Sequence, residues 1–272
     1  MTILQALILG VIEGLTEFLP VSSTAHILIA EELLGVSANE TAFTFTVLVQ
    51  LGAIAALVLY FWKDLWSLAL AFLKGIRTRK PFEDFESRLA WLVALASLPT
   101  LAVGYLIRNL VTELFTDPLA GAGLRLLATA ALLTAAELLY KAQRPLTGIT
   151  WLDALWIGLV QVLTLVPGSS RSGAAILGGM TRGFDRSAAT RFAFLMSVPI
   201  MSAAGLYEAA GAFNRETVGF LPIILVGMAA AGVSGWYSIR WLVNYVSRRS
   251  LYPFAIYCFA LGAVCFGVYF IR

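Results

Sequence analysis

Charged side chains are scarce in this sequence. Of 272 residues only 13% are Asp, Glu, Lys or Arg, whereas soluble domains of ordinary composition carry about 25%. Hydrophobic residues make up 60% of the chain, and the mean hydropathy is +0.85. No run of Lys and Arg is long enough to form a nucleic-acid surface, and the net charge is only +3. These deficits exclude a soluble domain and a nucleic-acid partner, and they predict a multi-pass integral membrane protein.

Histidine and cysteine are rarer still. His26 is the only histidine. The two cysteines, Cys258 and Cys265, are seven positions apart in one apolar run, which on a helix is a rise of about 10 Å and too far for a disulfide bond. No basic segment precedes the first apolar run, so no cleavable signal peptide is expected. A phosphate-binding loop of the form Gly-x-x-x-x-Gly-Lys-Ser/Thr is also missing from the sequence.

Long apolar runs are what the sequence has in abundance. A membrane-spanning helix needs about 20 mostly apolar residues. Six runs qualify: Thr41–Trp62, Arg88–Ile107, Leu119–Tyr140, Ala189–Ala210, Val218–Trp241 and Leu251–Ile271. Two further apolar regions, Thr2–Leu34 and Trp151–Met180, are each broken by proline and polar residues, which is typical of two half-helices meeting at a turn. We therefore predict an all-α polytopic membrane protein with six transmembrane helices and two re-entrant helical hairpins.

The two broken regions resemble each other. Gln5–Glu13 aligns with Asp153–Gln161, which pairs Gly10 with Gly158. With a one-residue gap, the Pro-x-Ser-Ser at 20–23 then meets the Pro-x-Ser-Ser at 167–170. The chain thus reads as a hairpin and three spans, repeated once, within a single integral-membrane domain of halves 1–145 and 146–272. Because three is odd, the second half is expected to be inverted, and matched interruptions predict a site where the two repeats meet.

Basic residues predict the orientation. They follow the first span, the third span, the second hairpin and the fifth span, as Lys63, Lys74, Arg77, Arg79, Lys80, Lys141, Arg144, Arg182, Arg186, Arg191, Arg240, Arg248 and Arg249. All lie on one side if each hairpin returns to the side it entered, and that side should be cytoplasmic. Asp117, the Asn214-Arg215-Glu216 loop and both termini are then expected outside.

The first hairpin carries two carboxylates on one helix face. Glu13 and Glu17 are at i and i+4, and each ionisable group costs several kcal/mol to keep in hydrocarbon. The pair becomes favourable beside a cation, which is either an arginine or a hard metal ion such as Mg²⁺ or Ca²⁺. Pro20 ends this half-helix, and Ser22 or Ser23 is then placed as the N-cap of the next.

Hydroxyl groups and one imidazole follow directly. A helix start has free N–H groups and the positive end of a dipole, which suits an anion. His26 lies one turn after Ser23, and a hydroxyl with an imidazole at this spacing is the minimum for an activated nucleophile. The second hairpin repeats the anion-binding pattern with Ser169, Ser170 and Ser172 around Arg171, whose planar fork of donors fits a phosphate group.

With these motifs in place, the sequence resembles the undecaprenyl-diphosphate phosphatase family, also called bacitracin-resistance proteins. The resemblance rests on Glu-x-x-x-Glu with Pro-x-Ser-Ser-Thr-x-His at 13–26 and on Pro-Gly-x-Ser-Arg-Ser-Gly at 167–173, and it runs nearly end to end. Ala25 and Ala175 depart from the glycine and threonine that the family often has there. The resemblance implies hydrolysis of a C55 polyprenyl diphosphate to the monophosphate, recycling of the lipid carrier for cell-wall polymers, a divalent cation, and a site on the outer face of the bacterial plasma membrane. Homodimer formation is left open.

The residues expected to act follow from both arguments. Catalytic roles fall to Ser23, His26, Glu17 and Arg171, and a metal ion to Glu13 and Glu17. Phosphate binding is expected from Ser22, Thr24, Ser169, Ser170, Arg171 and Ser172. The nucleophile is Ser23 with His26 as its base, or His26 itself, or else water attacks directly; Glu17 is an alternative partner that orients His26. A phosphate transporter or lipid-phosphate flippase is the main rival, because inverted repeats with broken helices are common in transporters.

Overall fold

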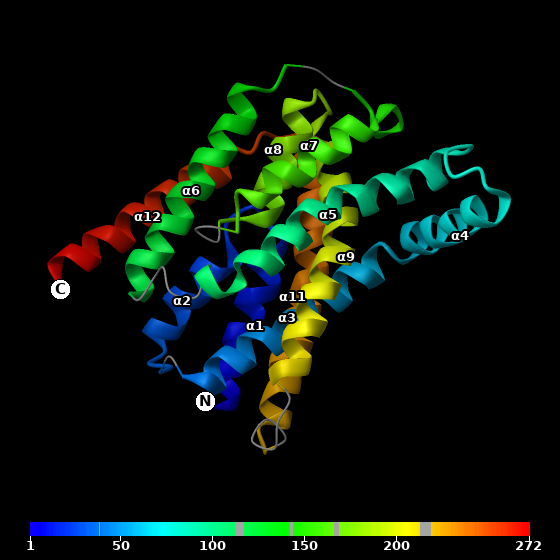
Figure 1. Ribbon diagram of the computed structural model, residues 1–272. Helices are drawn as coiled ribbons and strands as arrows, with labels where there is room; N and C mark the ends of the chain where they lie inside the picture. The colour runs from blue at the N-terminus through cyan, green and yellow to red at the C-terminus, as the bar shows by residue number, and fades with distance from the viewer. Residues whose placement is uncertain (38, 112–116, 142–143, 166–168, 213–218) are drawn as a thin grey trace.

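The chain folds into helices that pack as one bundle, as the computed structural model shows (Figure 1). The structure describes residues 1–272 except 38, 112–116, 142–143, 166–168 and 213–218. The turn expected at Pro167-Gly168 and the loop at Asn214-Arg215-Glu216 therefore lie outside the described residues. The helices are α1 (Ile3–Phe18), α2 (Ser23–Leu33), α3 (Glu40–Tyr60), α4 (Trp62–Thr78), α5 (Phe85–Val111), α6 (Pro118–Leu138), α7 (Trp151–Val162), α8 (Arg171–Thr181), α9 (Arg186–Ala212), α11 (Leu221–Val246) and α12 (Tyr252–Ile271), with a 3₁₀ turn, η1, at Leu146–Gly148.

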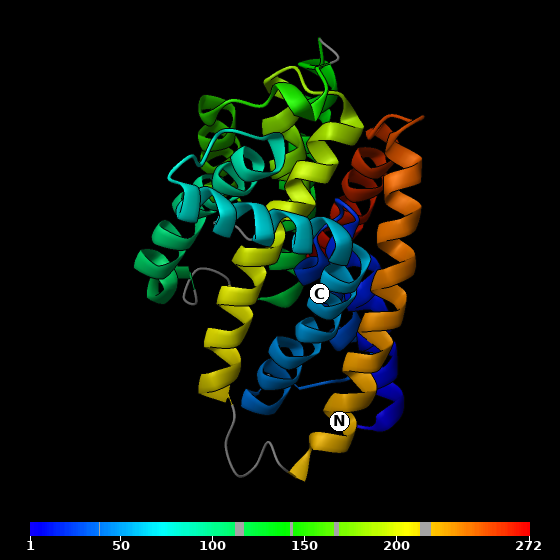
Figure 2. The same cartoon turned by 90° about the vertical axis from the view of Figure 1, so that its right-hand side faces the viewer.

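Six of these helices are long and apolar enough to cross a membrane. They are α3, α5, α6, α9, α11 and α12, over Thr41–Tyr60, Phe85–Ile107, Pro118–Leu138, Arg186–Gly211, Leu221–Val246 and Tyr252–Ile271. Each coincides with one predicted span to within a few residues, so the prediction of six spans in an all-α membrane protein is confirmed. Figure 2 shows α9 and α11 running along most of the length of the molecule.

Both predicted breaks are present as well. The first apolar region forms α1 and α2 on either side of residues 19–22, and the second forms α7 and α8 on either side of 163–170. The two pairs approach from opposite ends of the bundle, with α7 and α8 above α1 and α2 in Figure 1. The helix pairs are therefore observed, and their re-entrant position in a bilayer stays a prediction.

Reciprocal packing joins the two halves. Helix α1 packs along α11, and α7 packs along α5, so the first helix of each pair contacts the middle span of the other half. The aligned glycines make this approach close. A Cβ atom at Gly10 would lie 2.3 Å from the carbonyl oxygen of Gly227, and one at Gly158 would lie 2.2 Å from that of Ala96. No side chain fits at such distances, so glycine at both positions lets two backbones touch.

Helix α4 follows the first span, in a segment where no helix was predicted from the sequence. Asp64 in its first turn and Arg77 in its last both complement the helix dipole. Its exposed face carries a stripe of large apolar side chains: Trp62, Trp66, Leu70, Leu73 and Ile76. The search for runs of about 20 apolar residues missed this helix, because its apolar positions recur at a helical spacing between charged ones.

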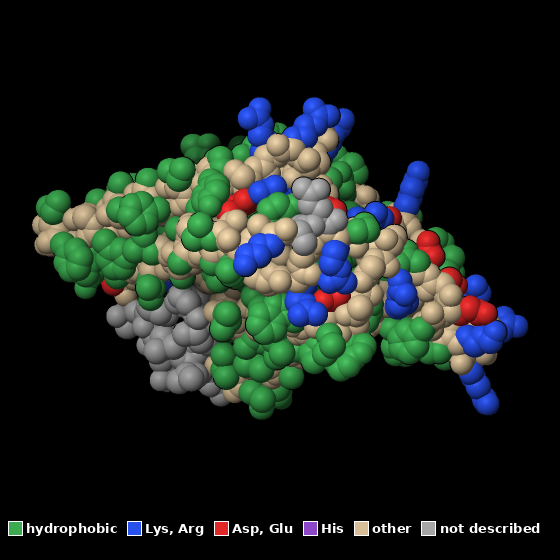
Figure 3. Space-filling view, turned by 90° about the horizontal axis from the view of Figure 1, so that it is seen from above, with side chains coloured by type: hydrophobic (Ala, Val, Ile, Leu, Met, Phe, Trp, Pro, Cys, Tyr) green, Lys and Arg blue, Asp and Glu red, His purple; other side chains and the backbone are tan. Residues whose placement is uncertain are grey.

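Basic side chains gather on one end of the bundle, which Figure 3 shows from above. Some of them neutralise buried acids. Asp153 is fully buried, and it accepts hydrogen bonds from Arg182 Nε at 2.6 Å and Arg144 Nη2 at 3.1 Å. Glu137 forms a two-pronged ion pair with Arg186, at 2.9 and 2.5 Å. These arginines, read from the sequence only as markers of orientation, also hold α6, α7, α8 and α9 together.

Candidate active site

Two helix starts, α2 at Ser23 and α8 at Arg171, meet inside the bundle. Helix α8 is capped by Ser170, whose hydroxyl accepts a hydrogen bond from the Gly173 amide at 3.1 Å. Ser170 is held in turn by α6, because its own amide donates to Thr129 Oγ1 at 3.1 Å. The start of α2 differs. Ser22 occupies its N-cap position with φ 68° and makes no capping bond with its side chain. A non-glycine residue in this left-handed region costs on the order of 1 kcal/mol or more, which the surrounding contacts must offset.

The carboxylate of Glu17 connects the two helix starts. Its Oε2 accepts a hydrogen bond from Ser23 Oγ at 2.5 Å, and its Oε1 accepts one from Arg171 Nη2 at 2.9 Å. The Glu17 side chain is 4% exposed, whereas that of Arg171 is 30% exposed. The negative charge is therefore buried and paired, and the guanidinium keeps one side open to a further anion. A short bond to a carboxylate also polarises the Ser23 hydroxyl toward loss of its proton.

Glu13 lies beneath this cluster. It is buried on α1 one helical turn before Glu17, so the two carboxyl groups share one face of the helix. Among the described residues, no group of three or more His, Cys, Asp or Glu side chains is placed to hold a metal ion. Two carboxylates still match the way Mg²⁺ is held, because that ion takes one or two protein carboxylates and completes its shell with water and substrate phosphate.

A small pocket opens at the junction. Its lining consists of Glu17, Ser22, Ser23, Thr24, Ser169, Ser170 and Arg171. All seven are residues that the sequence predicts for the site. Of the other predicted residues, Ser172 lies behind the lining and shares a hydrogen bond of 3.1 Å with Ser170. The free space is about 20 Å³, which is room for about one water molecule, so a diphosphate needs these side chains to move apart.

His26 is not arranged as expected. Its Nδ1 lies 2.8 Å from the carbonyl oxygen of Ser22, and its Nε2 lies 2.8 Å from the hydroxyl of Tyr257 on α12. Both ring nitrogens are thus engaged away from Ser23, whose hydroxyl bonds to Glu17 instead. The anticipated pairing of Ser23 with His26 is not what the structure shows, and Glu17 does not orient His26.

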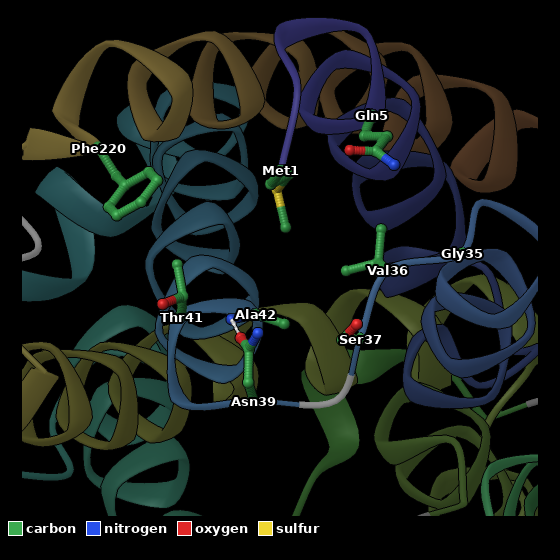
Figure 4. Close-up of a pocket in the computed structure, with 9 residues that line it drawn as sticks. All are labelled: Met1, Gln5, Gly35, Val36, Ser37, Asn39, Thr41, Ala42 and Phe220. Carbon is green, nitrogen blue, oxygen red and sulfur yellow. Dashed lines mark hydrogen bonds between the residues drawn. The ribbon is translucent and has the colours of Figure 1, made fainter.

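A second pocket, of about 280 Å³, lies at the other end of α1 (Figure 4). The polar side chains around it hold local backbone: Gln5 donates to the Leu34 carbonyl at 3.0 Å, and Asn39 accepts from the Ala42 amide at 2.9 Å, which caps α3. No acidic or basic side chain is among the residues that line it. The smaller pocket at Arg171, where a hydroxyl, a carboxylate and a guanidinium meet, remains the candidate site.

Sequence reasoning missed two residues of the site. Thr129 is fully buried on α6, where it holds the Ser170 amide and donates its own hydroxyl hydrogen to the Arg125 carbonyl at 2.7 Å. Tyr257 lies on α12, 231 positions from its partner His26. Thr129 resembles any small residue of a span, and the only signal for Tyr257 was a polar tip in an otherwise apolar run.

The Thr129 contact makes a prediction. Thr129→Val keeps the shape of the side chain and leaves the buried Ser170 amide without its acceptor, which should lower the free energy of unfolding by about 1–3 kcal/mol. Thermal unfolding of the detergent-solubilised protein measures the loss. Thr190→Val is the matched control, because the buried Thr190 hydroxyl has no hydrogen-bond partner in the described part of the chain. Equal stability of the two variants would contradict this role of Thr129.

Comparison with known proteins accords with this geometry. Residues 6–264 match the family model described as bacitracin resistance protein BacA. The chain is 38% identical over 264 residues to a Myxococcus xanthus (strain DK1622) protein named undecaprenyl-diphosphatase, covering 97% of this chain and 88% of that protein. It is 37% identical over 279 residues to one of the same name from Chlorobium phaeobacteroides (strain BS1), covering 98% and 97%. A third, from Acidothermus cellulolyticus (strain ATCC 43068 / DSM 8971 / 11B), is 41% identical over 255 residues, covering 93% and 91%. The chain belongs to the bacitracin resistance protein BacA family.

Proposed function

We propose that this protein hydrolyses undecaprenyl diphosphate to undecaprenyl phosphate and inorganic phosphate. The reaction recycles the lipid carrier of cell-wall polymer synthesis and thereby supports resistance to bacitracin. The names of its relatives support this substrate. The observation that carries the chemistry is the Glu17 carboxylate, which bridges the hydroxyl of Ser23 and the guanidinium of Arg171. One position thus offers a nucleophile, a proton acceptor and a cation for phosphate.

Phosphate binding comes first. Arg171 turns from Glu17 toward the diphosphate, and the pocket widens as it does so. The terminal phosphate then accepts hydrogen bonds from the guanidinium and from the amides at the starts of α2 and α8, where the helix dipoles favour negative charge. Hydroxyl groups of Ser22, Thr24, Ser169 and Ser170 surround the same space, and Ser172 supports Ser170 from behind. These donors stabilise the negative charge on the phosphoryl oxygens in the transition state.

Phosphoryl transfer to Ser23 follows. Its oxygen forms a bond to the terminal phosphorus while its proton passes to Glu17 Oε2, and the bond to the bridging oxygen breaks. Undecaprenyl phosphate leaves with that oxygen. Water then attacks the phosphoserine and gives its proton to the Ser23 oxygen, while Glu17 returns its own proton to the released phosphate. Glu17 is the general base in place of His26, because Glu17 is the group that accepts the Ser23 hydrogen bond.

A divalent cation is part of the proposal. Glu13 and Glu17 would hold it together with oxygens of the diphosphate. Its chemistry there is to neutralise charge on the leaving phosphate. A hard ion such as Mg²⁺ or Ca²⁺ suits two carboxylates, and the burial of Glu13 and Glu17 one turn apart on α1 supports the assignment.

The setting of the reaction is the bacterial plasma membrane, with the site open to the extracytoplasmic side. Supporting this orientation, the basic side chains gather at the end of the bundle where α7 starts and α8 ends (Figure 3). Transport of phosphate or of the lipid without hydrolysis is the rival proposal. A transporter has no need of a nucleophile hydrogen-bonded to a carboxylate, so the Ser23–Glu17 pair and the names of the relatives favour hydrolysis.

Ser23→Ala and Glu17→Gln test the reaction. Each should lower phosphate release from undecaprenyl diphosphate by purified protein in detergent on the order of 10³-fold or more, because each removes a group that acts in the transition state. Ser37→Ala and Glu31→Gln, outside the pocket at Arg171, are the matched controls and should keep full activity. Acid quenching should trap labelled phosphate on Ser23. Label on His26 or on neither residue would refute Ser23 as the nucleophile, and liposome flux without phosphate release would establish the transporter.

Glu13→Gln tests the cation. The variant should need a higher Mg²⁺ concentration for half-maximal phosphate release and should bind Mn²⁺ more weakly by electron paramagnetic resonance, since a neutral amide is a poorer ligand than a carboxylate. Glu31→Gln keeps the same change of charge at an acid outside the pocket and should behave as the parent protein does. An unchanged Mn²⁺ affinity in Glu13→Gln would remove Glu13 from the metal site.

The orientation can be tested with single cysteines in a background with both native cysteines replaced by alanine. Ser37→Cys in the turn before α3 should react with a membrane-impermeant maleimide added to intact cells. Arg79→Cys at the end of α4 should react only after the membrane is permeabilised. The reverse pattern would place the candidate site on the cytoplasmic side.

A further inference from the structure

His26 is held by a chain of two hydrogen bonds whose direction can be worked out. A carbonyl oxygen only accepts, so the 2.8 Å contact from His26 Nδ1 to the Ser22 carbonyl requires a hydrogen on Nδ1. In a neutral imidazole Nε2 then bears a lone pair, which accepts from the Tyr257 hydroxyl at 2.8 Å. The chain runs from Tyr257 through the ring of His26 to the backbone of Ser22.

Helix α12 supports this arrangement at two consecutive positions. The ring of Tyr257 stacks on that of His26, with centroids 5.6 Å apart and planes 14° apart. The next side chain, Cys258, lies with its Sγ 3.8 Å from the Val21 carbonyl, in the turn between α1 and α2. The last helix of the second half therefore contacts the turn that precedes the Ser23 hydroxyl.

The two hydrogen bonds end at the carbonyl of Ser22, which is the strained residue of the turn. Its φ is 68°, a value that side chains disfavour. Its carbonyl accepts from both the amide of His26, at 3.3 Å, and the Nδ1 of the same residue. Ser23 comes next in the chain, and its hydroxyl must reach Glu17 Oε2 at 2.5 Å. Any relaxation of the Ser22 backbone would move the Ser23 hydroxyl relative to that carboxylate.

We propose that Tyr257 is a positioning residue of the active site: its hydroxyl donates to Nε2 of His26 and fixes the position of the ring, and His26 in turn holds the Ser22 backbone that aims Ser23 at Glu17. The proposal rests on the proposed phosphatase reaction and assigns it a residue from α12. In this role His26 is structural, since its Nε2 lone pair accepts the hydrogen bond of Tyr257 and does not face Ser23. The pair adds nothing to substrate affinity and acts on the chemical step alone.

The first test reads the tautomer without reference to activity. Because His26 is the only histidine, ¹⁵N-histidine labelling yields one pair of imidazole signals from the whole protein. The parent protein should show hydrogen on Nδ1 and none on Nε2. Tyr257→Phe keeps the ring and removes the hydroxyl that donates to Nε2, so the Nε2 signal should shift as its lone pair loses this hydrogen bond. Tyr269→Phe, the same change further along α12, should leave both signals as they were. Hydrogen on Nε2 in the parent, or no change in Tyr257→Phe, would overturn the proposal.

The second test asks whether Tyr257 acts through His26. Tyr257→Phe should lower kcat about 10- to 100-fold with KM unchanged, because a small displacement of a reacting group slows chemistry by that order. In a His26→Phe background the same substitution should cause no further loss, since residues in one network are not additive. An equal loss in both backgrounds would overturn the proposal. If the parent releases no phosphate at all, the proposed function fails, and the imidazole signals still decide the Tyr257 assignment.

Discussion

The structure depends on a buried ion pair, between Glu17 and Arg171, that joins the two helix pairs. Glu17 is almost completely enclosed, and Arg171, 154 positions further along the chain, is its ion-pair partner. Removing one member of such a pair leaves an uncompensated charge, at a cost of about 3–5 kcal/mol. The two helix pairs are therefore bound together by the same groups that are available for phosphate chemistry.

Close backbone packing makes this meeting possible. The first residues of α2 and α8 can lie in the middle of the bundle only if the short helices pack directly against the spans. Gly10 and Gly158 provide this contact by letting a carbonyl oxygen of the neighbouring helix approach where a Cβ atom would otherwise stand. The two glycines occupy equivalent positions in the aligned sequences, and each packs on the middle span of the other half. An internal repeat predicts this arrangement.

Polar contacts are concentrated at the ends and turns of helices, where backbone groups would otherwise lie unpaired. Asp153 and Glu137 bind arginines at the basic end of the bundle. Ser170 and Thr129 satisfy the start of α8. At the start of α2 the backbone of Ser22 is instead held through the side chain of His26. The two helix starts are thus stabilised differently: a serine side chain caps α8, and an imidazole holds the backbone at the start of α2. Only the second carries the serine that we assign as nucleophile.

The sequence by itself determined the six spans, the two interruptions and the seven residues that line the pocket. These follow from hydrophobic length, from proline, and from the cost of polar groups in an apolar chain, all of which are local properties. Helix α4 lay within reach of such reasoning and was missed, because a count of apolar residues ignores their spacing. Only the tertiary structure decided that Ser23 pairs with Glu17, that Thr129 supports Ser170, and that His26 faces Tyr257. A hydrogen bond depends on where two helices lie to within an ångström, and that follows from the packing of the whole bundle.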